Sequence, residues 1–481
     1  MFAVTKSLAA LLACLLCWHP AAFAQTNEGN TPIDRQRLAA APVPLLEQWL
    51  SQGPFRQQYL EPERYHLQIL LTDIRRNSQI VSLTHHQYRP DAEYFYPAST
   101  VKLPVAVLAL EYLTKARIAA DSAMFTGAAW PGDTPRPTQP MMVGQPVLVD
   151  GQPTNSVVTN AGIAQPSVAE DVRRILLLSD NDAYNRLYEL LGPAYINKRL
   201  QELQLGPVQI RHRLERFLTI EQNHQLPPVT ILNRHGHPEL TLPARRDALT
   251  PLRPATPIGS AHWRDNKRIA SPLDFASRNQ WTLQSMHRLT LMLSAAIPSS
   301  STAILQLSAT DQRLLDYYRQ ITPAQLVAAD RHWQNGQDDM SLAQHHRNQL
   351  SQPDRSWLQN ALAEGPTTVK FLYYGATGEL DPTIVIRNKV GDAYGFYLDT
   401  AWFCDTVSGR EFVLSALIYA NSDGELGDSR YDDKTLAMPY LQWLGQTAVT
   451  HARHQASMSP SSAEAIAHCR NAASLITNRP M

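Results

Sequence analysis

Lysine is rare in this sequence, and its positions indicate acid–base chemistry. Only eight of the 481 residues are lysine, although lysine and arginine together number 43. Arginine keeps its proton in proteins, so a lysine in an arginine-rich chain is expected where an amine must act as a base. Among these lysines, only Lys102 has a serine, Ser99, three positions before it. Only Lys389 has a glycine, Gly391, two positions after it.

Ser99 and Lys102 have the spacing of a nucleophile and its base. Residues three positions apart in a helix lie on one face, so the amine can reach the hydroxyl. Residues 101–113 are apolar almost throughout, which predicts a buried helix. Burial lowers the pKa of a lysine, and the neutral amine can then take a proton from a nearby serine. A serine N-cap followed by an unrelated lysine is the alternative interpretation.

A Ser-Asp-Asn triplet at residues 179–181 is a second candidate for the same chemistry. Ser179 could relay protons, and the amide of Asn181 could bind a substrate amide. Ser, Asp and Asn are also the preferred N-caps of helices, and a helix is predicted over residues 182–191. The triplet alone therefore fits both interpretations.

Taken in order, Ser99-x-x-Lys102, Ser179-Asp180-Asn181 and Lys389-x-Gly391 resemble the signature elements of class A β-lactamases and penicillin-binding proteins. The resemblance covers roughly residues 60–450. It implies an exported serine hydrolase that opens β-lactam amides through an acyl-enzyme on Ser99. Lys102 and a water held by Glu215 are then the two candidate bases for acylation, and the resemblance does not decide between them. Ser179 and Lys389 would relay protons and hold positive charge. The amides of Ser99 and Asp392 are expected to form the oxyanion hole.

A glutamate distinguishes the members of this group. Glu215, in residues 213–219, is similar to the catalytic glutamate of class A enzymes, which holds the water that hydrolyses the acyl-enzyme. Penicillin-binding proteins lack this residue. Thr219 stands where the family pattern has asparagine, and we expect it to hold that water less well. A solvated charge cluster over residues 211–216 is the alternative.

The predicted substrate contacts are Asn181, Val390, Gly391 and Asp392, and two of them depart from the family. Val390 replaces the usual Ser or Thr, whose hydroxyl binds the substrate carboxylate. The Asp392 carboxylate would repel an anionic substrate unless it is paired or protonated. Residues 395–403 contain no arginine that could replace this contact. A D-alanyl peptidase or esterase on the same fold, or a non-catalytic cell-envelope binding protein, therefore remains an alternative.

The patterned segments predict an α+β fold. Residues 65–74 and 80–84 are predicted strands joined by a turn at 75–78, and helices follow at 182–191 and 194–203. Further strands are predicted at 383–388, 395–403 and 411–420, with a closing helix at 434–451. This order favours an antiparallel sheet built from both chain ends, flanked by an all-helical subdomain that carries the serine helix. The resemblance implies the same β-lactamase/transpeptidase-like fold.

The expected domain organisation begins with a signal peptide. Lys6, the apolar residues 7–18 and the small residues before Gln25 are typical of a cleaved secretory signal. The mature protein is therefore expected in the periplasm or secreted. A lipoprotein box ending at Cys14 is the alternative. The predicted parts are 1–24 signal peptide, 25–59 N-terminal helical segment, 60–452 hydrolase domain with insertions near 126–160, 221–282 and 330–365, and 453–481 loosely held C-terminal tail.

Composition limits the partners. The formal net charge is zero, which argues against a nucleic-acid-binding protein. No run of about 18 apolar residues follows the signal, so no membrane span is expected. Histidine and cysteine show no metal-ligand spacing, and no cofactor is expected. We expect a monomer acting on a small β-lactam or cell-wall peptide-like substrate. Cys404 and Cys469 form either a disulfide or two separate thiols.

Overall fold

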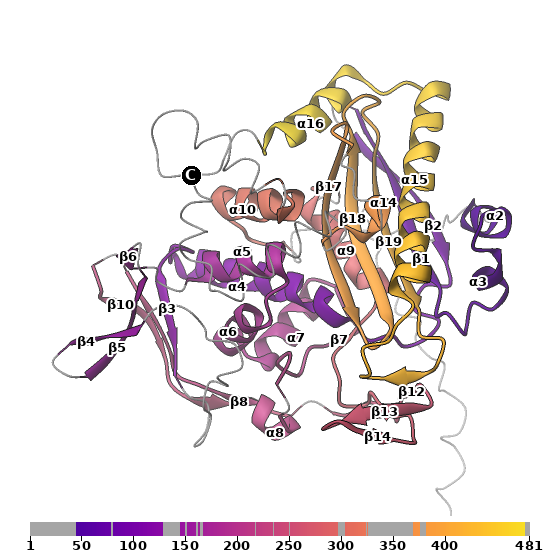
Figure 1. Cartoon of the computed structure of the whole chain (residues 1–481). Coiled ribbons are helices and arrows are strands. Elements are labelled where there is room, and N and C mark those ends of the chain that lie inside the picture. The colour runs from indigo at the N-terminus through magenta and orange to yellow at the C-terminus, as the bar shows by residue number, and fades with distance from the viewer. Residues whose placement is uncertain are drawn as a thin grey trace, which may run out of the picture. The chain divides into compact units, whose positions relative to one another are not determined.

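A computed structural model describes much of the chain (Figure 1). The described residues are 45–77, 80–127, 145–149, 152–159, 162–163, 167–216, 218–233, 235–249, 251–296, 304–323, 325, 369–375 and 381–476. The expected signal peptide and the insertion near 330–365 lie outside the described residues, as does much of the insertion near 126–160. These three expectations remain predictions.

A five-stranded antiparallel sheet joins the two ends of the described chain. Its strands, in spatial order, are β17 (Ile384–Ala393), β18 (Phe396–Asp405), β19 (Glu411–Tyr419), β1 (Gln68–Asn77) and β2 (Ile80–Tyr88). β1 therefore lies between β19 and its hairpin partner β2. The predicted α+β class with an antiparallel sheet built from both chain ends is confirmed.

The predicted turn at 75–78 is wrong for its first three residues. Arg75, Arg76 and Asn77 continue β1, and Asn77 pairs with Ile80 of β2. The two arginines suggested a solvated turn, but the Nε of Arg76 forms a 2.7 Å ion pair with Glu411 on β19. A charged side chain with a cross-strand partner of opposite sign is compatible with a strand.

Helices cover both faces of the sheet. One face packs against α15 (Met438–Met458), with α2 (Leu45–Gln52) and α14 (Phe371–Tyr374) in the same apolar cluster. The other face packs against α9 (Leu283–Leu293) and α16 (Ala463–Ser474). Figure 1 shows α15 beside the sheet on the side opposite the helices α4 to α7. β17 is the edge strand nearest to these helices.

The helical subdomain surrounds the serine helix. It consists of η1 (Ala98–Val101), α4 (Lys102–Ala116), α5 (Val168–Leu178), α6 (Asn181–Leu191), α7 (Pro193–Glu202) and α10 (Ala309–Gln320). Helix α4 is buried at every position from Lys102 to Glu111, as its all-round apolar sequence predicts. The predicted helices at 182–191 and 194–203 correspond to α6 and α7, which are separated by Gly192.

The insertion near 221–282 consists of short strands. The small elements in and around it are α8 (Ile220–Asn223), β8 (Gln225–Leu226), β9 (Val229–Leu232), β10 (Pro238–Leu242), β11 (Arg245–Arg246), β12 (Pro257–Ile258), β13 (Ala261–Arg264), β14 (Lys267–Ile269), β15 (Leu273–Asp274) and β16 (Gln280–Trp281). The remaining elements are α3 (Arg56–Leu60), β3 (Ala123–Thr126), β4 (Gln145–Val149), β5 (Gln152–Thr159), β6 (Gly162–Ile163), β7 (Val208–Gln209), β20 (Glu425–Leu426) and the π-helix η3 (Asp433–Ala437). Strands of two to five residues are too short to give a clear periodic pattern.

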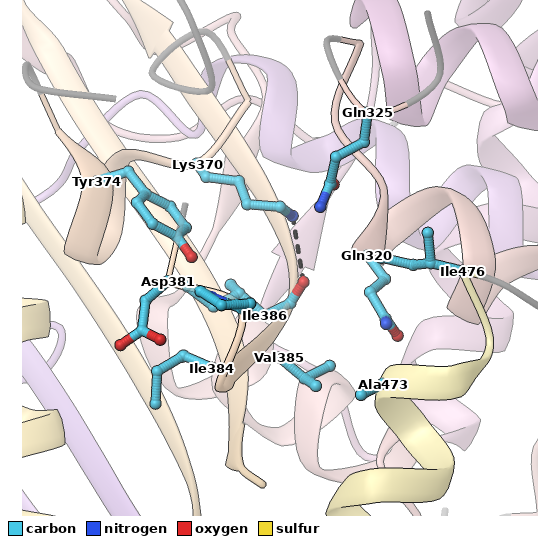
Figure 2. A pocket seen from close by; sticks show the side chains of 11 residues that line it. Gln320, Gln325, Lys370, Tyr374, Asp381, Ile384, Val385, Ile386, Ala473 and Ile476 are labelled. Carbon is cyan, nitrogen blue, oxygen red and sulfur yellow. Dashed lines mark hydrogen bonds between the residues drawn. The ribbon is translucent and has the colours of Figure 1, made fainter. Parts of the chain in front are cut away.

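A buried lysine fixes β17, the strand that carries Lys389. Lys370 Nζ donates to the carbonyls of Arg319 at 2.9 Å and Ile386 at 3.2 Å, and to Asn388 Oδ1 at 2.7 Å. Figure 2 shows Lys370 pointing at Ile386 from the wall of a hollow of about 200 Å³. Burial lowers the pKa of Lys370 to about 7. Without these hydrogen bonds, Ile386 and Asn388 of β17 would lose their attachment to Lys370.

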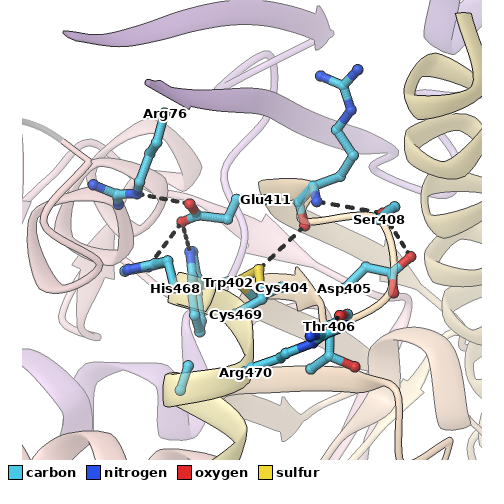
Figure 3. The surroundings of a disulfide bond; sticks show 12 residues. Arg76, Trp402, Cys404, Asp405, Thr406, Ser408, Glu411, His468, Cys469 and Arg470 are labelled. Carbon is cyan, nitrogen blue, oxygen red and sulfur yellow. Dashed lines mark hydrogen bonds and ion pairs between the residues drawn. A yellow bond between two sulfur atoms is a disulfide. The ribbon is translucent and has the colours of Figure 1, made fainter. Parts of the chain in front are cut away.

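The C-terminal segment packs against the sheet, so the predicted loosely held tail is wrong. Helix α15 runs to Met458, and α16 follows it. A disulfide joins Cys404 on β18 to Cys469 on α16, which decides between the two interpretations of these cysteines (Figure 3). Both cysteines are fully buried. The Ser/Ala-rich composition suggested a mobile tail, but this covalent bond and an apolar cluster hold it.

Candidate active site

Ser99 lies in the 3₁₀ turn η1 immediately before α4. It is half-buried, whereas its neighbours Ala98 and Thr100 are buried. Strand β17 passes close to this turn at Gly391. A Cβ added to Gly391 would lie 2.9 Å from the backbone nitrogen of Thr100 and 3.0 Å from the carbonyl oxygen of Pro97. Only glycine allows this approach, which explains the Lys-x-Gly motif physically.

The amine of Lys102 lies against the Ser99 hydroxyl in a fully buried position. Lys102 is 0 % exposed, and its Nζ donates to Ser99 Oγ at 2.8 Å. The amine also bonds to the hydroxyl of Ser179 at 3.1 Å and to the Ser179 carbonyl. Burial lowers the pKa of Lys102 to about 8, although the charges of Asp180, Glu215 and Asp392 oppose this. At pH 7, about a tenth of this amine is therefore uncharged.

Ser179 connects the two motif lysines. It ends α5 in the left-handed region with φ 52°, which turns the chain sharply between α5 and α6. Its hydroxyl accepts hydrogen bonds from Lys102 Nζ at 3.1 Å and from Lys389 Nζ at 3.0 Å. A hydroxyl can accept and donate, so Ser179 is able to pass a proton between the two amines.

Lys389 reaches this hydroxyl from β17. Its amine also donates to the carbonyl of Val390 at 2.8 Å. Burial lowers the pKa of Lys389 well below its usual value, and the neighbouring charge of Lys102 lowers it further. Two buried amines that share one hydroxyl cannot both be charged without a large electrostatic cost. The pair therefore favours a single positive charge.

The other two residues of the triplet divide the capping and binding roles. Asp180 is the N-cap of α6, and its carboxylate accepts the backbone N–H of Ala183 at 2.8 Å. Burial raises the pKa of Asp180, but the guanidinium groups of Arg174 and Arg186 outweigh this and lower it. Asn181 is the first residue of α6 and is half-buried. The capping interpretation is therefore right for Asp180, while Asn181 stays a predicted substrate contact.

Glu215 lies on a loop that is attached to α6. Asn185 holds the preceding residue twice: its Oδ1 accepts the N–H of Leu214 at 2.8 Å, and its Nδ2 donates to the Leu214 carbonyl at 3.0 Å. Glu215 is exposed, with φ 53°. The charge of Glu215 raises the pKa of Lys102, against the effect of burial.

Sequence reasoning missed the residues that hold this loop. Asn185 is one of them, and Arg213 is the second, with a 2.7 Å ion pair to Glu189 on α6. The hydroxyl of Thr219 caps α8 through the N–H of Gln222 at 3.2 Å, so it is occupied by a structural bond. Spacing along α6 could have indicated the anchor, because positions 185 and 189 lie one helical turn apart.

The altered substrate contacts, Val390 and Asp392, alternate with Lys389 and Gly391 along β17 and therefore share one side of the strand. Val390 is 3 % exposed and belongs to the apolar cluster beneath α15. Asp392 presents part of its side chain to solvent at the end of the motif. Protein atoms packed around its carboxyl group raise the pKa of that group, against the opposing charges of Lys389 and Lys102. Arg387 pairs with Asp316 on α10 at 2.8 Å. Arg387 is therefore engaged away from the Ser99 hydroxyl.

A family model matches part of the chain. Residues 65–251 match the model of the Beta-lactamase enzyme family. The predicted resemblance to β-lactamases and penicillin-binding proteins is confirmed. The β-lactamase-like match includes Ser99, Lys102, the 179–181 triplet and Glu215. It ends before Lys389, which the sheet brings to the same site.

Solved structures show a distant likeness. A mutant of PBP-A, in an acyl-enzyme complex with penicillin G, is 14% identical and has a TM-score of 0.42, covering 84% of this chain and 96% of that one. A class A β-lactamase representative from Bacteroides cellulosilyticus gives 11% identity and 0.41, covering 84% and 97%. The chromosome-encoded β-lactamase of Vibrio parahaemolyticus gives 12% and 0.39, covering 82% and 97%. The family relationship therefore depends on the model match.

Two further comparisons complete this description. No curated protein matches the chain. Within the described ranges, no helix combines the length and the apolar character needed to cross a bilayer.

Proposed function

We propose that this protein is an exported serine hydrolase that opens β-lactam amides through an acyl-enzyme on Ser99. The observation that carries the proposal is the 2.8 Å bond from Lys102 Nζ to Ser99 Oγ at a fully buried amine with a pKa of about 8. Such an amine matches the requirement for a general base near neutral pH. An N-cap serine beside an unrelated lysine would not need this burial.

In the acylation step, the neutral amine of Lys102 takes the hydroxyl proton of Ser99. The oxygen Oγ forms a bond to the amide carbonyl carbon, and the C–N bond then breaks. The leaving nitrogen receives a proton from Lys102 through the hydroxyl of Ser179, which lies within 3.1 Å of both lysine amines. Lys389 holds positive charge beside this relay.

In the deacylation step, Glu215 orients a water molecule and takes its proton. The hydroxide oxygen attacks the ester carbon, the ester C–O bond breaks, and Ser99 Oγ recovers the proton that Glu215 took from the water. The anchoring of Leu214 by Asn185 supports this role, because a general base must be held in position. The amides of Ser99 and Asp392 are the proposed oxyanion donors, and Asn181 is the proposed substrate-orienting residue.

The second candidate is a D-alanyl peptidase or esterase with the same nucleophile. The burial of Val390 in an apolar cluster and the carboxylate of Asp392 favour it, because both weaken binding of a substrate carboxylate. This enzyme would release a penicillin adduct slowly or prefer an uncharged ester.

A fluorescent penicillin tests the proposal and separates the candidates. Mass spectrometry of the mature protein would locate the adduct, while absorbance follows opening of the lactam. Fast turnover with an adduct on Ser99 supports the β-lactamase, and a persistent adduct supports the peptidase. Turnover that continues undiminished in the S99A variant would reject both.

A further inference from the structure

A polar pocket lies beside the end of β17, and its wall does not include Ser99, Lys102, Ser179 or Lys389. Its volume is about 630 Å³, which is within the range of small-molecule sites. The wall residues come from the insertion near 221–282, from Tyr394 after β17 and from residues 423–430. We call this the insertion pocket.

Backbone hydrogen bonds between strands hold the wall of the insertion pocket together. Strand β13 pairs antiparallel with β14 and parallel with β20, in the loop that follows β19. The backbone nitrogen of Ser260 also donates to the carbonyl of Gly424 at 2.8 Å. Figure 1 shows β13 and β14 below the end of the central sheet. The insertion and the sheet are thus joined at this pocket.

Tyr394 links the pocket to the proposed active site. It lies three residues after Gly391, and its ring centroid is 5.5 Å from that of Tyr96, which precedes Ser99 by three residues. β17 is an edge strand, and an extended chain can lie along such an edge. The acyl part of a substrate that runs along β17 from Ser99 would therefore reach the insertion pocket.

Arg278 is the unmatched charge of this pocket. It is half-buried, and its guanidinium forms no hydrogen bond or ion pair with any residue in the described ranges. The acidic wall residue Glu425, in contrast, pairs with Arg268 at 2.7 Å and accepts the indole N–H of Trp263 at 3.0 Å. A half-buried arginine without a counter-ion favours an anion, and a carboxylate can pair with its guanidinium in two parallel hydrogen bonds.

The other charged wall residues differ in exposure. Asp265, Asp423, Arg264 and Arg430 are exposed, and Asp428 is half-buried. Asp423 accepts the backbone N–H of Glu425 at 2.9 Å, and Asp428 accepts that of Arg430 at 3.0 Å. Arg278 is the least exposed arginine of the wall, and its charge acts on Tyr96 beside the Ser99 turn.

We propose that the insertion pocket binds a carboxylate on the acyl side of the substrate and that Arg278 pairs with it. This inference rests on the proposed acylation of Ser99 and names the substrate class that the enzyme prefers. The carboxylate belongs to the part of the substrate that stays on the enzyme after the C–N bond breaks. Arg278 is accordingly a specificity residue rather than a member of the acylating group.

Two penicillins that differ in one carboxylate test the proposal kinetically. The probes are benzylpenicillin and its analogue with a carboxylate on the acyl side chain, and the rate of Ser99 acylation per unit concentration is measured for each. In R278Q we expect about a tenfold loss for the dianionic probe and no loss for benzylpenicillin, because one charge pair is removed. The control R246Q changes an exposed arginine of the same insertion on β11 and should affect neither. Equal effects of R278Q on both probes, or no effect, would overturn the proposal.

Equilibrium binding separates this inference from the proposed function. The probes are phenylmalonic acid monoamide and phenylacetamide, and saturation-transfer NMR compares their binding to S99A and to S99A/R278Q. We expect the anionic monoamide to bind several-fold more tightly to S99A, and this preference to vanish in the double variant. If the unmodified protein is acylated by neither penicillin, the proposed function fails. The binding preference of S99A for the anionic amide would still show whether the insertion pocket binds a carboxylate. Equal binding of the two amides to S99A would reject the carboxylate site.

Discussion

The amine of Lys102 donates to the hydroxyl of Ser99 across 2.8 Å, and no part of Lys102 is exposed to solvent. In water this amine would be charged at neutral pH and unable to accept a proton. Inside the fold, burial lowers its pKa to about 8. The pair therefore combines a nucleophile with a base whose pKa is close to the working pH.

Replacement of Ser99 tests the nucleophile. S99A is expected to abolish the covalent penicillin adduct and to leave the fold intact, because the side chain is half-buried and loses one oxygen. Mass spectrometry of the intact protein measures the adduct, and circular dichroism checks the fold. The matched control S457A lies at an exposed position on α15 and should label fully. An adduct of unchanged yield on S99A would contradict the assignment.

The acylation rate should rise with pH up to about 8. Only the neutral amine of Lys102 accepts the Ser99 proton, and its fraction increases as pH approaches the pKa from below. Well below pH 8, the rate should fall about tenfold per pH unit. K102R should lower the rate by about 10²- to 10⁴-fold near pH 8 and remove this pH dependence, since arginine stays protonated. Stopped-flow acylation between pH 5.5 and 9 measures both, and a flat profile would exclude Lys102 as the base.

Glu215 should act after acylation. E215Q keeps the size of the side chain but removes the base, so we expect acylation within a few-fold of the normal rate. Deacylation should slow by about 10²- to 10⁴-fold, and the adduct on Ser99 would then accumulate. Time-resolved mass spectrometry separates the two steps. If E215Q releases product as fast as the unmodified protein, the enzyme resembles the peptidase candidate or uses another base.

Asn185 should act through the position of Glu215. N185A removes both bonds to Leu214, and we expect deacylation to slow by about 10- to 100-fold while acylation changes little. Asn197 is a matched control, because it makes the same pair of bonds to Ile210 at 2.8 Å each. N197A should reduce stability without this selective effect. Equal loss of both steps in N185A would indicate a general disturbance of the site instead.

The disulfide between Cys404 and Cys469 should stabilise the domain. It closes a loop over a sequence separation of 65 residues, and its removal is expected to cost about 2–4 kcal/mol of unfolding free energy. Urea denaturation of C469S, compared with the C404S/C469S double variant, measures this cost. The two variants should agree within error. Unfolding curves that do not change on reduction of the unmodified protein would contradict the expectation.

The elements that the sequence predicts well are those with an uninterrupted local pattern. Helix α4 is one, because its residues are apolar around almost the whole circumference, and such a helix is stable only when it is buried. The strands β18 and β19 are similarly clear. The motif lysines could be found because lysine is rare in this chain, although their shared contact with Ser179 depends on folding.

The features that were missed depend on partners distant in sequence. Arg76 looked like a turn residue, and only the position of Glu411 across the sheet makes it compatible with a strand. The anchors Asn185 and Arg213 show no motif, because their bonds join α6 to a loop. Helix α16 gave a weak signal, although Ser462 is its N-cap and accepts the N–H of Ala465 at 3.2 Å.

Strand β1 lies between β2 and β19 in the sheet. The first strand of this sheet in the sequence therefore cannot complete its pairing until the last one, β19, is present. Ser99 and Ser179 leave the ribosome long before Lys389, and β17 has no firm support until β18 and β19 are present. An incomplete chain would thus contain the nucleophile without the second amine or the strand that carries it. The side chains of Ser99, Lys102, Ser179 and Lys389 can therefore meet only after the C-terminal strands have joined the sheet.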